Sequence, residues 1–110
     1  MARMDSVITV NVNWDKNPDY ESLQNVLMLA YNQAESGKGK ERHAKNNEKF
    51  EDQKICEITR RVGLGYPLGQ AIKKAEESIV LCKEAGLREI LGAINYLSAA
   101  YIVMNEGDDT

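Results

Sequence analysis

The feature that most constrains this chain is a pair of long helical patterns in its second half, separated by one glycine. Apolar residues recur every three or four positions from Pro67 to about Ala85, and again from Leu87 to about Asn105. Gly86 lies between the two patterns and predicts the end of the first helix. Because the connection is so short, we expect these helices to fold back on each other as an antiparallel hairpin.

Each helix of this predicted hairpin carries an apolar stripe. The first stripe is Leu68, Ile72, Ala75, Ile79 and Cys82, and the second is Leu87, Ile90, Leu91, Ile94, Leu97, Ser98, Tyr101 and Ile102. The small residues Gly92, Ala93, Ala99 and Ala100 would let neighbouring helices approach closely. Asn95, at a position near the core, either sets packing specificity or hydrogen-bonds a ligand, and we favour the first role.

Two further helices are predicted upstream. Asn17 and Pro18 form a helix start, and this helix should run to about Ser36. Its middle is apolar nearly all round, which favours a subunit interface, with a crowded monomeric core as the alternative. The second helix should run from Glu51 to Val62 and be ended by Gly63, with Arg60 and Arg61 matching the helix dipole.

The remaining segments are predicted to lack helix. The run Ser6–Asn13 alternates as a short strand does, so it forms an arm over the helices or pairs with another subunit, and Trp14 anchors this arm or stacks on a ligand. The polar run from Gly37 to Phe50 predicts a long loop, with Phe50 returning to the core.

Together these patterns predict one all-α domain, a small bundle of four helices ending in a long antiparallel hairpin, with a short N-terminal strand or arm. We expect the arm over residues 1–17, the helical domain over 18–105 and an acidic tail over 106–110. No membrane span and no secretory signal pattern is visible, so a cytoplasmic location is expected, with Cys56 and Cys82 as reduced structural thiols.

Charge is segregated along the chain. The net charge is −3, but the segment from Lys38 to Lys74 carries ten Lys or Arg and five acids, which leaves the rest strongly acidic. Such a protein is poorly suited to coating long nucleic acid, yet its basic middle could attract a small anion. The alternative is a solvated loop with mixed charges.

The joint between the second and third predicted helices is the candidate anion site. Arg60 and Arg61 precede a glycine turn and Pro67 begins the next helix, whose free amides would add donors for a phosphate. Cations of the joint and loop would meet phosphates, and Tyr66 or Trp14 would stack on a base. The residues expected at this site are Arg60, Arg61, Gly65, Tyr66, Lys73, Lys74, Lys40, Arg42, His43 and Trp14. A helix C-terminus favours positive charge, so the position of the two arginines at the end of a helix would also explain them without a ligand.

Catalysis and DNA binding are the alternatives. One histidine and two cysteines are too few for a metal site of those ligands, so we expect no metal, no cofactor and no enzyme activity. A MazG-like nucleotide pyrophosphohydrolase would need paired acidic clusters, of which Glu48 and Glu51 make one. The run from Glu57 through Gly65 into the next helix is similar to a helix-turn-helix, but Pro67 and Gly69 would occupy the first turn of its recognition helix.

Four runs of the chain resemble a family of small uncharacterised bacteriophage proteins: Gly37–His43, Phe50–Gln53, Gly69–Lys74 and Leu91–Leu97. The terminal hairpin is also similar in outline to phage anti-CBASS and anti-Thoeris sponge proteins, which sequester cyclic oligonucleotide or ADP-ribose-derived immune signals without cleaving them. The tryptophan- and alanine-rich second helix of those sponges is not reproduced, so no binding residue carries over. The phage family itself implies no function, whereas the likeness to the sponges implies an anti-defence protein in the host cytoplasm that binds a phosphorylated nucleotide without turning it over. We expect this protein to be a homo-oligomer.

Overall fold

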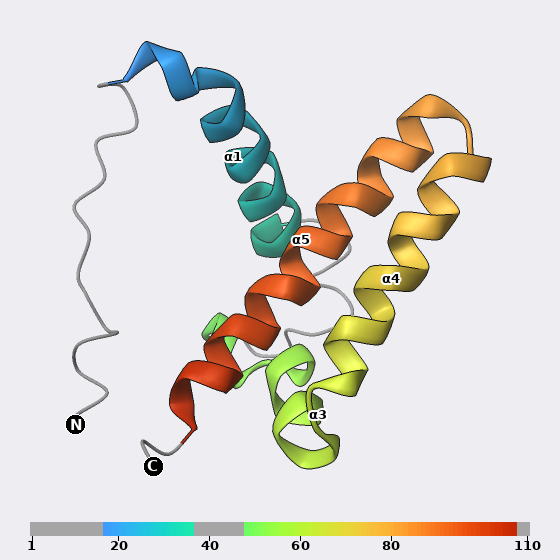
Figure 1. The fold of residues 1–110 in the computed structure, drawn as a ribbon. Coiled ribbons are helices and arrows are strands. Elements are labelled where there is room, and N and C mark those ends of the chain that lie inside the picture. The colour runs from blue at the N-terminus through green and yellow to red at the C-terminus, as the bar shows by residue number, and fades with distance from the viewer. Residues whose placement is uncertain (1–16, 37–47, 108–110) are drawn as a thin grey trace.

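The computed structural model of the chain describes residues 17–36 and 48–107, and within these ranges the protein is all-α (Figure 1). The α-helices there are α1 (Glu21–Ser36), α3 (Lys54–Val62), α4 (Gly65–Val80) and α5 (Lys83–Glu106). Single 3-10 turns at Pro18–Tyr20 and Phe50–Asp52 precede α1 and α3. The predicted fold class, a small helical bundle ending in an antiparallel hairpin, is confirmed. The predicted strand and Trp14 lie outside the described residues, as does most of the predicted loop.

The helix α5 is the centre of the arrangement (Figure 1). The helix α4 runs antiparallel along one side of it, and α1 crosses on the other side. The short helix α3 packs against both helices of the hairpin, near the start of α4 and the end of α5. None of the described helices has the length and apolar character needed to cross a membrane.

The turn of the hairpin lies earlier than its glycine suggests. The helix α4 ends at Val80, and α5 begins at Lys83, so Gly86 does not end a helix but is buried in the first turns of α5. A Cβ atom on Gly86 would collide with the backbone carbonyl oxygen of Ser78. This glycine therefore permits close helix approach rather than a left-handed turn, and the prediction that it stops the first helix was wrong.

The start of α4 is also earlier than predicted. The helix begins at Gly65, and Pro67 is its third residue, buried in the first turn. A proline is tolerated there because the first amides of a helix have no partner inside the helix. At the other end of the hairpin, α5 extends to Glu106, one residue into the predicted acidic tail.

The two hairpin helices meet through small residues and not through their large apolar stripes. Ala71 of α4 and Tyr96 and Ala99 of α5 are buried, whereas Ile72 is 60% exposed and Ile79 is 82% exposed. The stem of Lys74 lies over Gly92, where a Cβ atom would be 3.0 Å from Lys74 Cδ. The small residues predicted to allow close approach are thus used here, and the apolar stripe of α4 faces away from the contact.

The helix α3 completes the core. Ile55 and Cys56 are buried against Ala71, Tyr96 and Ala99, and Phe50 packs against the same cluster, as the sequence predicted. Thr59, the other deeply buried residue of α3, donates a hydrogen bond to the Ile55 carbonyl at 2.7 Å. Gly63 ends the helix at a φ of +103°, a conformation that favours glycine, so its predicted role is confirmed.

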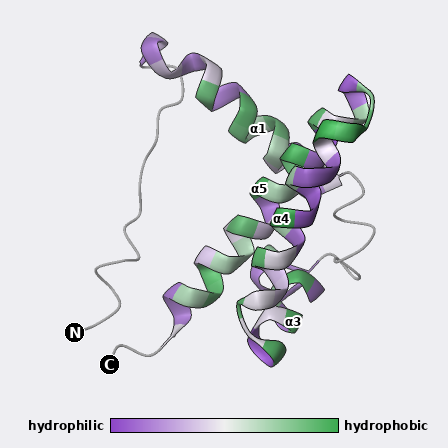
Figure 2. Cartoon of the chain, turned by 45° about the vertical axis from the view of Figure 1, so that its right-hand side comes forward, coloured by the Kyte–Doolittle hydropathy of each residue, from purple (hydrophilic) through white to green (hydrophobic). Residues whose placement is uncertain are grey.

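The helix α1 is the most loosely packed element. Asn17 Oδ1 accepts a hydrogen bond from the Asp19 amide at 3.0 Å, which confirms the predicted start. Ala30 is the buried residue of α1, and Leu23, Leu29 and Tyr31 are each more than half exposed. Apolar residues cover much of this helix (Figure 2). A crowded monomeric core around α1 is therefore excluded for the described chain.

Candidate functional site

The structure describes part of the predicted anion site at the α3–α4 joint. The first cation of this site, Arg60, is paired with a carboxylate. Arg60 Nε and Nη2 donate to the two carboxylate oxygens of Glu106 at 2.8 and 2.7 Å, and Nη2 also donates to the Glu51 carbonyl at 2.6 Å. The hydrogen bond to Glu106 raises the pKa of the Arg60 guanidinium above its ordinary value. The structure thus uses Arg60 to tie α3 to the end of α5.

The other described cations of this predicted site also have acidic partners. Arg61 pairs with Glu57 at 3.3 Å along α3, and Lys73 pairs with Glu77 at 3.8 Å along α4. Each pair joins residues one turn apart on the surface of a single helix. Lys74 Nζ lies 3.2 Å from Glu89 Oε1 and 5.8 Å from the centre of the Tyr96 ring.

The other described residues of the predicted site, Gly65 and Tyr66, do not add a binding surface to these cations. Tyr66 packs its ring edge-on against Tyr96, with ring centres 5.8 Å apart. Gly65 is exposed, and the amide of Tyr66 donates to the Gly63 carbonyl. Lys40, Arg42, His43 and Trp14 lie outside the described residues. The described part of the joint is therefore a set of separate ion pairs and does not converge on one anion.

A different site lies between α1, α5 and the segment before α3. It is a pocket of about 550 Å³. Its apolar walls come from Leu27, Ala30 and Ala34 of α1, from Ile94 and Ile102 of α5, and from Phe50. Ala30 and Ala34 are one helical turn apart, so both lie on the face of α1 that looks toward α5. Because these side chains are short, α1 can approach α5 at this level and still leave a hollow.

Polar groups of the pocket are amides, hydroxyls and carboxylates. Gln53 is 8% exposed, and its Nε2 donates to the Glu48 carbonyl at 3.0 Å. Asn95 Nδ2 donates to the Ala30 carbonyl at 3.0 Å. Within the described residues, neither side-chain carbonyl oxygen, Gln53 Oε1 or Asn95 Oδ1, receives a hydrogen bond.

Among the described residues, the charges that line this pocket are negative. Glu35 and Glu48 line it together with Tyr31 and Ser98, whose hydroxyl donates to the Ile94 carbonyl. No lysine, arginine or histidine is among its described lining residues. The described lining therefore offers hydrogen-bond acceptors in an apolar hollow, and the negative charges of Glu35 and Glu48 disfavour a phosphate beside them.

The sequence marked Phe50 and Asn95, and it placed three further lining residues, Ile94, Ser98 and Ile102, in the apolar stripe of the last helix. The structure supports the favoured structural role of Asn95, because this side chain joins α5 to α1, and it also places Asn95 at the pocket. Sequence reasoning missed Gln53 and Glu35, and it considered Glu48 only as one of an acidic pair with Glu51. A glutamine at the end of a 3-10 turn and a glutamate on a polar helix face carry no signal until the three segments are brought together.

The described residues also limit what chemistry the site can do. Among them, no three His, Cys, Asp or Glu side chains come together in a way that could hold a metal ion.

Comparisons of the chain with protein-family models, with curated proteins and with solved structures gave no match. The resemblance to phage proteins therefore stays a prediction from the sequence.

Proposed function

We propose that this chain is a non-catalytic binding protein that holds a small ligand in the pocket between α1, α5 and the Phe50–Gln53 segment. The observation that carries the proposal is the pocket itself, with its volume of about 550 Å³ and its buried Gln53 amide. Ligand sites of proteins have volumes of about 300–1,000 Å³, apolar walls and a few placed polar groups. The pocket has each of these properties.

The lining supports a particular class of ligand. Its free acceptors, Gln53 Oε1 and Asn95 Oδ1, call for N–H donors, and Phe50 and Tyr31 supply aromatic surface. Glu35 and Glu48 favour a neutral or positively charged molecule over an anion. The ligand class is a flat heterocycle that bears amino or imino groups, to which nucleobases belong.

This proposal keeps one part of the prediction from sequence and changes another. Sequestration of a nucleotide-like ligand without cleavage is retained. The group recognised by the described residues is the base, because the described cations expected to hold the phosphates are paired with Glu106, Glu57, Glu77 and Glu89. The helix-turn-helix and pyrophosphohydrolase alternatives gain no specific support from the described contacts.

A thermal shift series tests the proposal. Adenosine and guanosine should raise the melting temperature in proportion to the logarithm of their concentration, and each should be recovered intact. Their 5′-monophosphates should bind more weakly, and pyrophosphate should have no effect. Cyclic dinucleotides and cyclic ADP-ribose belong in the same series, because they test the ligands that the sequence predicted. No shift with any nucleoside or nucleotide at millimolar concentration would refute the proposal.

A matched pair of variants places the binding in this pocket. Ala34→Phe fills the hollow from α1, so it should abolish the ligand-induced shift. Ser22→Phe adds the same ring to an exposed position of the same helix and should leave the shift unchanged. Equal binding by both variants would show that the ligand sits elsewhere.

A further inference from the structure

No other described segment of the chain covers a broad apolar surface on one side of the hairpin. On α4 the surface consists of Leu68, Ile72, Ala75 and Ile79, and on α5 it consists of Ile90, Leu97, Tyr101 and Met104; we call these eight residues the hairpin face. The seven larger side chains are between 40% and 82% exposed. On each helix the residues are spaced by three, four or seven positions, so they form one continuous stripe.

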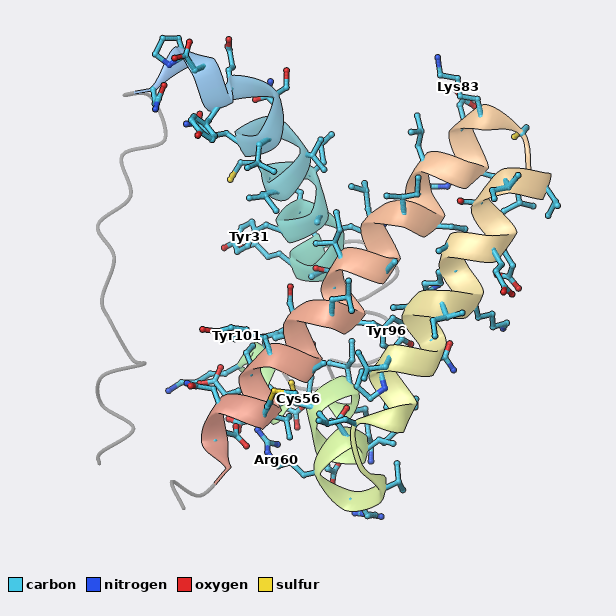
Figure 3. All side chains as sticks on the ribbon, in the orientation of Figure 1. Tyr31, Cys56, Arg60, Lys83, Tyr96 and Tyr101 are labelled. Carbon is cyan, nitrogen blue, oxygen red and sulfur yellow. The ribbon has the colours of Figure 1, made fainter. Side chains whose placement is uncertain are left out.

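The two stripes lie on the same side of the hairpin. At about 100° per residue, the stripe of α4 is rotated by about 100° from Ala71 and Lys74, which contact α5. The stripe of α5 is rotated by about 140° in the same sense from Gly92 and Tyr96, which contact α4. Because the helices are antiparallel, these rotations bring both stripes to one side. Figure 3 shows Tyr96 between the two helices and Tyr101 projecting away from α4.

The eight residues of the hairpin face carry no charge, and the exposed Glu76 of α4, one turn from Ile72 and from Ile79, lies at its edge. No charged residue occurs in α5 from Ile90 to Met104. On α4, Lys73 and Glu77 pair with each other away from the stripe. A soluble helix usually places polar residues on its outer side, so two neighbouring apolar stripes of this length indicate a surface that is covered in the working protein.

The exposed area matches what one partner contributes to a stable protein–protein interface. The seven exposed fractions amount to about four whole side chains, or roughly 800 Å² at about 200 Å² each, and a standard interface buries about 800 Å² per partner.

We propose that the hairpin face binds the hairpin face of a second copy, which forms a four-helix bundle between two subunits. A second copy of the chain suits this surface because of its lack of charge. An uncharged face can meet itself across a two-fold axis without placing like charges opposite each other, and it offers no charge with which to select a different partner. Two antiparallel hairpins stacked face to face also give the packing of a four-helix bundle. The proposal does not depend on the pocket, which opens between α5 and α1.

Sedimentation equilibrium and light scattering test this dimer. The wild-type protein should have twice its chain mass of 12.3 kDa, and dilution should dissociate it. Ile72→Glu and Leu97→Glu each bury a carboxylate in the interface, so each should raise the dissociation constant at least about 100-fold with the helical circular dichroism unchanged. Val62→Glu changes an equally exposed apolar residue of α3, 64% exposed and off the hairpin face, and should stay dimeric.

Several results would overturn the proposal. A wild-type protein that is monomeric at every concentration up to about 100 μM would do so, since interfaces of this size hold in the micromolar range or better. An assembly that keeps its mass in both Ile72→Glu and Leu97→Glu would show that another surface is used. If either variant fails to fold, Met104→Glu gives the same test at a position 62% exposed in the single chain.

Discussion

Arg60 shows how one side chain can match the dipole of its own helix and also join two helices. It lies in the last turn of α3, and its guanidinium holds the Glu106 carboxylate of α5 through two hydrogen bonds. Arg61, the next residue, pairs only along its own helix with Glu57 and is 73% exposed at the side chain. Two adjacent arginines that look equivalent in the sequence therefore differ in what they stabilise.

We predict that Arg60→Ala lowers the free energy of unfolding by about 1 kcal/mol, because a two-point charged hydrogen bond between helices is lost. The Glu106 and Arg60 side chains are 41% and 36% exposed, so solvent screening keeps the effect at this size. Arg61→Ala should change stability by less than about 0.5 kcal/mol. Urea unfolding of both variants measures the difference, and equal losses would contradict the assignment.

Cys56 links stability to pH in the alkaline range. Burial raises the pKa of its thiol from 9.0 to about 11, although the positive charge of Arg60 acts in the opposite direction. Below pH 9 the thiol is protonated in both states, and between pH 9 and 11 the unfolded chain loses this proton while the folded chain keeps it. Stability should therefore fall as pH rises through this window.

The size of that loss can be isolated with a variant. Between pH 8 and pH 10, the wild-type protein should lose about 1 kcal/mol more stability than Cys56→Ala, since one pKa unit corresponds to about 1.4 kcal/mol. All other side chains are the same in both proteins, so their contributions cancel in the comparison. Identical pH dependence would mean that the Cys56 thiol ionises in the folded state as readily as in the unfolded chain.

At the scale of elements, the close contact of α4 and α5 depends on Gly86. Gly86→Ala places a methyl group against the Ser78 backbone carbonyl, which cannot rotate away as a flexible side chain can. We predict a loss of about 1–3 kcal/mol in the free energy of unfolding. Gly69→Ala in α4, where nothing lies within 4 Å, should instead stabilise the protein by about 0.5–1 kcal/mol. Guanidinium unfolding distinguishes the two, and a neutral Gly86→Ala would show that the turn can relax.

The existence of the helices could be predicted because apolar period, caps and charge at the helix ends agree, as at Asn17 and Gly63. The boundary near Gly86 could not, because a glycine that ends a helix and a glycine that admits a neighbouring carbonyl look the same in sequence. The sequence also did not show which element each apolar stripe packs against. Small residues such as Ala71 and Gly92 determine the α4–α5 contact, which leaves Ile72 and Ile79 outside it.

At the scale of the whole molecule, function is harder to predict than fold because sites combine distant segments. The charge pattern identified a basic segment from Lys38 to Lys74, but each described cation of the α3–α4 joint is paired with an acid, and in two cases that acid comes from α5. The pocket combines α1, α5 and the turn before α3, and its residues Gln53 and Glu35 have no distinctive pattern of their own. Only the packing of the helices reveals it.

The two walls of the pocket differ in how firmly they are held. The wall from α5 belongs to the hairpin and its core, whereas α1 is attached through the buried Ala30, the Asn95 hydrogen bond and one from Gln33 Nε2 to the Arg88 carbonyl at 3.2 Å. Binding between these walls must therefore restrict the motion of α1, and part of the binding energy is spent on that ordering. Affinity would then respond to preorganisation: a substitution that stiffens α1 on its outer side, far from the ligand, would tighten binding.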